Sequence, residues 1–157
     1  MNEKLPIIIA IGSLILMNKR KLWSISDKAK KHLSNETEEL INYFSSKYSI
    51  PAGVVAGIVL TESYDDPLAS GQAGEIGIMQ ITEPAFNEVN NHYKLNYSFT
   101  QCYVKKLGLL AGMLYLKLIH TKYSLTWLNA IKAYNVGPDL KPASAANVYF
   151  NKVIRWL

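Results

Sequence analysis

The sequence contains little cysteine and little charge, and both shortages limit what the protein can be. Cys102 is its single cysteine, so an internal disulfide is excluded. No Cys/His pair has zinc-site spacing, and His32, His92 and His120 lie far apart, so we interpret them as surface or structural histidines and expect no metal and no cofactor. With 157 residues, 49% of them hydrophobic and 18% charged, the chain can build one well-packed core.

Positive charge exceeds negative charge only slightly and is unevenly distributed. The net charge of +5 at pH 7 favours anionic partners. The basic residues do not alternate with aromatic ones, as they do along a nucleic-acid groove, so we expect no nucleic acid. Many of them gather near the N-terminus, at Lys19, Arg20, Lys21, Lys28, Lys30 and Lys31. This placement indicates a membrane surface.

Residues 5–17 form an uncharged apolar run, LPIIIAIGSLILM. A helix of this length spans about 20 Å, whereas the hydrocarbon core of a bilayer is about 30 Å thick. The run therefore fits a membrane anchor, a secretory signal or a buried helix of the domain. We favour the anchor, and hence a membrane-associated protein, because Lys19–Lys21 can snorkel and Trp23 suits an interface. The chain then divides into an anchor or signal-like hydrophobic helix (1–23), a basic linker (24–35) and a folded domain (36–157).

The rest of the chain predicts helices, because its apolar residues recur at helical spacing and no segment alternates strictly. Asn35 and Glu38 form an N-terminal capping pair. Glycine and proline are frequent over 65–80, which predicts a loop. Helices are expected over about 35–47, 51–63, 82–91, 102–122, 124–134 and 144–157. Their first residues or caps are expected at Asn35, Pro51, Thr82, Ser124 and Ser144. The expected fold class is mainly α.

Glu62 differs from the other charged residues because it shares a helix face with aliphatic side chains. Val55, Ile58 and Val59 precede it at the spacings of one face. Such a face points into a core or a cleft wall, where burial raises a glutamate pKa from about 4.3 towards neutrality. Glu62 also ends its helix beside the loop, where a substrate can reach it. It is a candidate general acid, although this pattern alone also fits a surface glutamate paired with a lysine.

Four ordered segments strengthen that assignment. They are Glu62-Ser63, Ala69-Ser70, GEIGIMQI over 74–81 and AYNVGP over 133–138. Further positions that belong to the same pattern are Ala111-Gly112, Tyr115-Leu116, Tyr149 and 151–153. In order and spacing these residues resemble the catalytic domain of the soluble lytic transglycosylases, which has a lysozyme-like fold. The resemblance covers roughly residues 40–155.

The resemblance implies a lysozyme-like helical domain that binds and cleaves peptidoglycan glycan strands. In this family one glutamate is thought to protonate the glycosidic oxygen and then to accept a proton from the C6 hydroxyl of the sugar, which leaves a 1,6-anhydro-N-acetylmuramic acid end. Glu62 matches this glutamate and is the expected catalytic residue. The positions expected to bind substrate are Ser70, Gly77, Met79, Gln80, Tyr134 and Asn135.

The resemblance also implies a role for individual residues of that set. Gly77 lets the loop backbone pass close to the sugar. Met79 packs against an apolar sugar face, and Gln80 hydrogen-bonds to the sugar. Tyr134 resembles a tyrosine that orients the catalytic carboxylate, and Asn135 lines the same cleft. Taken singly, these residues also fit ordinary turn, core and helix-end positions.

Three positions depart from the family pattern. The family usually has a serine three residues before the first loop glycine, whereas this chain has Gly71 there and Ser70 one residue earlier, which makes a pairing of Ser70 with Glu62 uncertain. Glu75 replaces a usually small residue and brings a charge near the cleft. Val136 replaces a usual alanine.

Asp65 and Asp66 follow Glu62 closely, and either can serve as a second carboxylate that activates water. A muramidase of the goose-type lysozyme kind is therefore an alternative, and a non-catalytic membrane or virion component that keeps the fold is another. The positive-inside rule places the domain on the cytoplasmic side of an anchor, away from the wall. A virus-encoded protein that acts during entry or lysis resolves this conflict.

Overall fold

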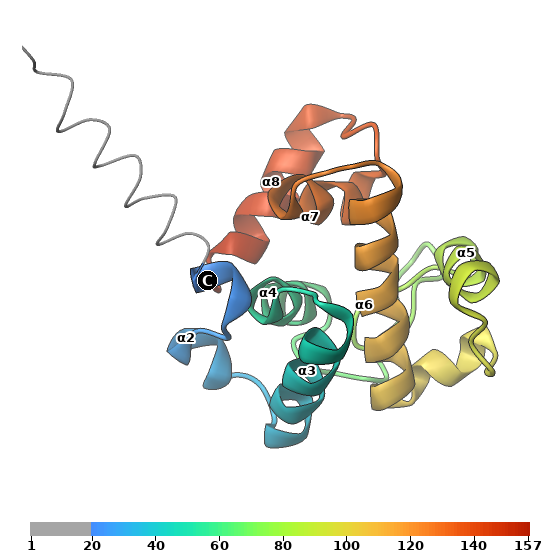
Figure 1. Cartoon of the computed structure of the whole chain (residues 1–157), viewed down its shortest axis with the longest axis horizontal. Helices are drawn as coiled ribbons and strands as arrows, with labels where there is room; N and C mark the ends of the chain where they lie inside the picture. Colours follow the sequence, from blue (N-terminus) through green and yellow to red (C-terminus); the bar gives the residue numbers. More distant parts are fainter. Residues whose placement is uncertain (1–19) are drawn as a thin grey trace, which may run out of the picture.

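Helix α4 (Ala52–Glu62) lies at the centre of the computed structural model, which describes residues 20–157 (Figure 1). Its first nine residues, AGVVAGIVL, are all buried, because their side chains are small or aliphatic. Two glycines let neighbouring segments approach: a β-carbon on Gly57 would lie 2.8 Å from the carbonyl oxygen of Val153, and one on Gly53 would lie 2.4 Å from that of Lys21. Close contacts with these segments therefore hold α4 within the core.

Other helices surround α4. They are α2 (Asp27–Lys30), α3 (Asn35–Tyr48), α5 (Glu83–Tyr93), the 3-10 helix η1 (Phe99–Tyr103), α6 (Lys105–Lys122), α7 (Trp127–Val136) and α8 (Ala143–Ile154). Helix α4 contacts α2, α3, α7 and α8, while α6 packs against α3, α5, α7 and η1. Figure 1 shows α6 between the central helices and α5. Residues 20–157 contain isolated bridges but no β-strand, so the prediction of a mainly α fold is confirmed.

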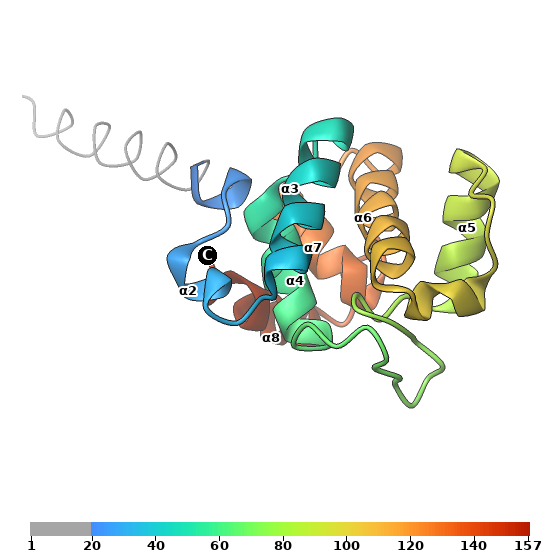
Figure 2. The same cartoon turned by 90° about the horizontal axis from the view of Figure 1, so that it is seen from below.

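The loop between α4 and α5 has an apolar cluster of its own. Figure 2 shows this loop extending from one side of the helices. Two of its side chains, Ile76 and Ile81, are buried with Phe86 of α5, Cys102 of η1 and Ala111 of α6. The cluster fastens the loop to α5 and α6, so the loop has a defined position relative to Glu62.

The predicted helices are present, but several begin at other residues. The residues that precede α3, α7 and α8 are Ser34, Thr126 and Pro142, in place of the expected Asn35, Ser124 and Ser144. Each has an extended backbone, and Ser34 and Thr126 accept a hydrogen bond from a backbone N–H in the first turn. The long helix begins at Lys105, because residues 99–103 form η1. Where two neighbouring residues can both cap a helix, the sequence does not show which one does, because tertiary contacts decide where the helix begins.

The segment 24–35, predicted to be a basic linker, is folded onto the domain. It contains α2, and its apolar residues Ile25, Ala29 and Leu33 are buried in the same core as α4. The linker prediction is therefore wrong. These apolar residues recur every four positions, and the lysines between them occupy the outer face.

The hydrophobic helix predicted over 1–23 lies outside the described residues except for its last four. Residues 20–23 are helical up to Trp23. Within the described part of the chain, no helix is both long enough and apolar enough to cross a membrane.

Candidate active site

Glu62 is the last residue of α4, and its carboxyl group meets a tyrosine from the far end of the chain. The Tyr149 hydroxyl on α8 donates a hydrogen bond of 2.6 Å to Glu62 Oε1. The close packing of α8 on α4 at Gly57 brings the two side chains together. Tyr149 is buried, whereas Glu62 is only partly buried. A carboxyl group held in this way can exchange a proton with a bound molecule.

The surroundings of Glu62 raise its pKa to about 7, from an ordinary value of 4.5. Burial is the main cause, because it disfavours the charged form. The hydrogen bond from Tyr149 lowers the pKa, the negative charge of Glu75 raises it and the positive charge of Lys152 lowers it. The shift has the direction expected from the apolar helix face. A protonated Glu62 is thus well populated at neutral pH, as a general acid requires.

Backbone hydrogen bonds shape the loop that follows Glu62. The Gly71 N–H donates to the Glu75 carbonyl (2.8 Å), and the Gly77 N–H donates to the Ala69 carbonyl (2.9 Å). Gly77 has a φ of 77°, and a β-carbon there would lie 2.3 Å from the Cys102 carbonyl oxygen. The chain therefore needs glycine at 77 for its contact with η1, a reason that the sequence did not reveal.

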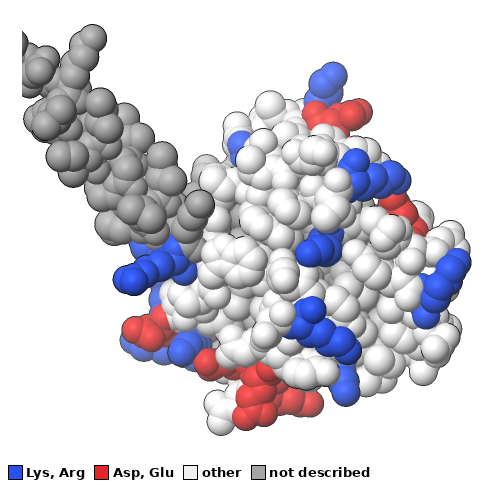
Figure 3. Space-filling view, in the orientation of Figure 1, with Lys and Arg blue, Asp and Glu red and all other residues white. Residues whose placement is uncertain are grey.

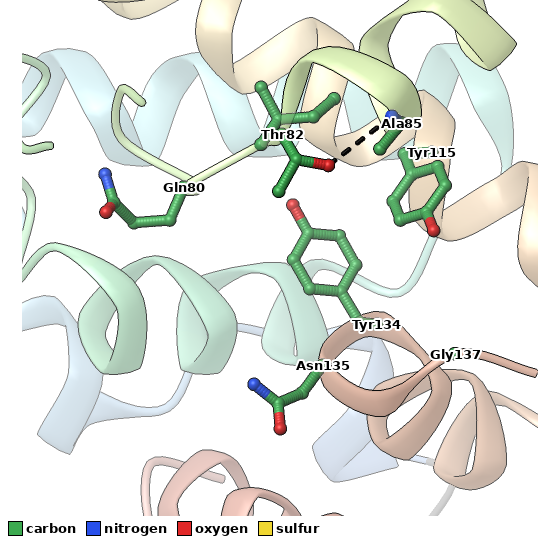
Figure 4. Close-up of a pocket in the computed structure, with 8 residues that line it drawn as sticks. Gln80, Thr82, Ala85, Tyr115, Tyr134, Asn135 and Gly137 are labelled. Carbon is green, nitrogen blue, oxygen red and sulfur yellow. Dashed lines mark hydrogen bonds between the residues drawn. The ribbon is translucent and has the colours of Figure 1, made fainter. Parts of the chain in front are cut away.

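A cavity of about 160 Å³ lies beside this loop (Figure 4). Its lining includes Tyr115 and three of the predicted substrate-binding residues, Gln80, Tyr134 and Asn135. In Figure 4, Gln80 and Asn135 lie on one side of the Tyr134 ring and Tyr115 lies on the other. The Gln80 amide nitrogen donates to two loop carbonyls, at 3.0 and 2.9 Å, so this side chain also holds the loop. The cavity thus combines amide groups with aromatic rings.

One role implied by the resemblance is wrong, that of Met79, and the contact expected of Tyr134 with the carboxyl group is not observed. Met79 is fully buried against Gly112 of α6, where a β-carbon would lie 2.5 Å from the Met79 Cβ. Its side chain therefore fills the core beneath the cleft and cannot pack against a sugar. Tyr134 lines the cavity, but its hydroxyl donates to the Met79 carbonyl (2.9 Å). The tyrosine that holds the carboxyl group of Glu62 is Tyr149.

The two serines near Glu62 hold the loop rather than the carboxyl group. The Ser70 hydroxyl lies 2.9 Å from the Tyr103 hydroxyl on η1. The Ser63 hydroxyl donates to the Ile78 carbonyl (2.8 Å), which ties the loop to the end of α4. The pairing of Ser70 with Glu62 is therefore not observed.

Asp65, a candidate second carboxylate, is engaged in holding α3. It accepts hydrogen bonds from the Ser34 N–H (2.7 Å) and from the Thr37 hydroxyl, and it lies 3.9 Å from the Lys105 ammonium group. Asp66 is exposed and accepts a hydrogen bond within its own turn. Neither side chain is directed to Glu62 by these contacts.

The contact of Tyr149 with Glu62 was not predicted, although Tyr149 is part of the family pattern. It depends on the packing of Val153, one helical turn after Tyr149, against Gly57, which no local sequence pattern indicates. Among residues 20–157, no group of three or more His, Cys, Asp or Glu side chains is arranged to hold a metal ion.

Comparison with known proteins identifies a family and several solved structures that share this fold. The family model for the transglycosylase SLT domain matches residues 39–154. The 70 kDa soluble lytic transglycosylase from Escherichia coli has a TM-score of 0.68 at 18% identity, covering 75% of this chain and 23% of that chain. An inactive glutamate-to-glutamine mutant of the lytic transglycosylase Slt from Pseudomonas aeruginosa has a TM-score of 0.62 at 18% identity, covering 75% and 21%. A complex of the 70 kDa soluble lytic transglycosylase with bulgecin A has a TM-score of 0.61 at 20% identity, covering 74% and 20%.

This chain spans less than a quarter of the length of these solved structures. Comparison with curated proteins gave no match. The family model nevertheless covers most of the chain, from α3 to the end of α8, and the solved structures share the helical fold. The resemblance identified in the sequence is therefore confirmed, and the protein belongs to the transglycosylase SLT domain family.

Proposed function

We propose that this protein is a lytic transglycosylase that cleaves the bond between N-acetylmuramic acid and N-acetylglucosamine in peptidoglycan. Membership of the transglycosylase SLT domain family supports this activity. The observation that carries the proposal is a single carboxyl group, Glu62, with a pKa of about 7 and a hydrogen bond from Tyr149. One of the matched structures is that of an inactive glutamate-to-glutamine mutant, so a glutamate is needed in that protein.

In the proposed mechanism Glu62 acts first as an acid and then as a base. It gives its proton to the glycosidic oxygen while the bond from C1 of the muramic sugar to that oxygen breaks. The resulting carboxylate, stabilised by the Tyr149 hydroxyl, accepts the proton of the C6 hydroxyl of the same sugar. The C6 oxygen bonds to C1 and closes the 1,6-anhydro ring. No water is consumed, and Glu62 returns to its protonated form.

The cavity beside the loop is the proposed site for a sugar next to the cleaved bond. The Asn135 amide can hydrogen-bond to hydroxyl and acetamido groups, and the Tyr134 and Tyr115 rings offer apolar faces. Gln80 lines the same cavity while it holds the loop. Glycan binding at this place would rest on these polar groups and aromatic rings.

Product analysis tests this proposal. Purified peptidoglycan is digested with the full chain, and mass spectrometry identifies the new ends. Anhydro-muramic ends support the proposal, whereas reducing ends indicate a hydrolase of the lysozyme type. Glu62→Gln keeps the size of the side chain but removes its titration, and it is expected to lower the rate by about 10²–10⁴-fold. Full activity of this variant excludes Glu62 as the catalytic residue, and an inactive wild-type chain points to a non-catalytic glycan-binding role.

We also propose that the N-terminal segment associates with a membrane. The uncharged run over 5–17, the adjacent Arg20 and Lys21, and a Trp23 side chain that is 49% exposed support this. On the face drawn in Figure 3, lysine and arginine side chains are scattered over largely uncharged surface, and acidic side chains lie nearer its edges. Fractionation of cells that express the full chain, compared with a chain without residues 1–19, tests the association. A viral origin stays a prediction.

A further inference from the structure

In the loop, the carboxyl group of Glu75 occupies the space that a side chain at position 71 would fill. The ideal position of a β-carbon on Gly71 is 2.0 Å from both Cδ and Oε1 of Glu75. The two residues face each other across a tight turn, because the Gly71 N–H donates to the Glu75 carbonyl. The carboxyl group of Glu75 therefore folds back over Gly71, and it can do so only because residue 71 has no side chain.

This arrangement links two of the departures noted in the sequence. Position 71 has glycine where the family pattern has serine, and position 75 has glutamate where the pattern has a small residue. The glutamate carboxyl group thus fills the space that a side chain of residue 71 would occupy. The two departures are therefore sterically compatible with each other.

The Glu75 carboxyl group is also incompletely bonded. Its Oε2 is buried, yet it has no hydrogen-bond partner among residues 20–157. Burying a carboxylate oxygen without a donor costs free energy, so such a group in a folded protein calls for an explanation. By contrast, the oxygens of Asp65 have partners at the start of α3. Glu75 therefore has a buried carboxylate oxygen with capacity for a further interaction.

We propose that Glu75 is a second functional carboxylate of this site, a positioning residue whose charge, held over Gly71, keeps the proton on Glu62 until the glycosidic oxygen accepts it. The proposal rests on the lytic transglycosylase function and deepens it. Because like charges repel, an anion near Glu62 disfavours its ionised form. The proton is transferred when Glu62 gives it to the leaving oxygen.

The other charged and titratable groups around Glu62 act in known directions. Tyr149 and Lys152, both on α8, lower the pKa of Glu62, whereas Glu75 raises it. Burial, followed by the negative charge of Glu62, raises the pKa of Tyr134 on α7. Of these four groups, Glu75 is the one whose charge opposes the ionisation of Glu62.

The test compares two variants in the full-length chain. Glu75→Gln removes the charge, and Gly71→Ala displaces the carboxyl group by adding a β-carbon in its place. Both are expected to move the alkaline limb of the pH–rate profile to lower pH, so the rate at pH 8 falls about three- to tenfold while the rate at pH 5 stays within about twofold. Asp66→Asn is the matched control, because it removes an exposed loop charge and keeps the acceptor oxygen.

A second measurement does not depend on activity. Carbon-13 labelling of glutamate carboxyl groups follows the titration of Glu62 by NMR, with Glu62→Gln to assign the signal. A lower Glu62 midpoint in both test variants, and not in the control, supports the proposal. An unchanged midpoint, or an equal shift in Asp66→Asn, overturns it. If the wild-type chain does not cleave peptidoglycan, the proposed function fails, while the NMR midpoint still decides the role of Glu75.

Discussion

Helix α4 and the loop over residues 63–82 meet at Glu62 but are stabilised in different ways. Nine consecutive residues of α4 are buried, so apolar packing holds this helix in its position. The loop contains left-handed residues, isolated bridges and side chains that hydrogen-bond to backbone carbonyls. The helix thus gives the carboxyl group a fixed origin, and the loop supplies the polar surroundings. The Glu75 carboxyl group, which folds over Gly71, is one of these polar groups.

The largest expected effect on stability is in the loop, at the position where it contacts η1. Gly77→Ala places a β-carbon against the Cys102 carbonyl in a left-handed conformation, and it is expected to lower the free energy of unfolding by about 3 kcal/mol or more. Urea denaturation measures this loss. Gly74→Ala is the control, because its φ is also positive but no atom lies within 4 Å, so about 1 kcal/mol is expected. Equal losses would show that strain, and not the contact with η1, dominates.

The end of α4 is tested by the pH dependence of stability. The folded pKa of Glu62, about 7, exceeds its ordinary value of 4.5, so protonation of Glu62 contributes stability that is full below pH 4.5 and is lost as the pH rises through 7. Glu62→Gln has no carboxylate to bury, and it is expected to be more stable than the wild type by about 1–3 kcal/mol at pH 8.5. Thermal melting from pH 4 to 9 measures the difference. A difference that does not vary with pH would contradict this origin.

A smaller effect is expected where the loop is tied to α3. Asp65→Asn keeps an acceptor but removes the charge that holds the Ser34 N–H and faces Lys105. A loss of about 1–2 kcal/mol in unfolding free energy is expected, with the same cleavage products as the wild type. Chemical denaturation and product analysis are measured on the same sample. Loss of activity without loss of stability would return Asp65 to the list of catalytic candidates.

The smallest effect is expected at the hydrogen bond between Tyr149 of α8 and Glu62 at the end of α4. Tyr149→Phe removes the donor to Glu62 and keeps the ring in the core. Since this hydrogen bond lowers the pKa of Glu62, its loss raises that pKa and moves the alkaline limb to higher pH, opposite to Glu75→Gln. The rate at the optimum is expected to fall less than about tenfold. A limb that moves to lower pH would show that Tyr149 does not stabilise the carboxylate.

The sequence predicted the helices well and their caps less well, for an identifiable reason. Apolar spacing is a property of each segment, so α3, α4 and α6 follow from local pattern. Ser34 and Asn35 are both good caps, and the hydrogen bond from the Ser34 N–H to Asp65 forms only when the loop and α3 pack together. A choice that depends on a partner distant in sequence is invisible to local pattern.

The residues of the site divide in the same way. The sequence by itself determined the helical class, the family and the position of Glu62 at the end of an apolar helix. Only the tertiary structure decided that Met79 lies in the core, that Tyr149 donates a hydrogen bond to the Glu62 carboxyl group and that the Glu75 carboxyl group lies over Gly71. The spacing of apolar residues predicts which helix faces are buried, whereas the burial of a loop side chain, its hydrogen bonds and its charge interactions depend on distances between segments that packing brings together.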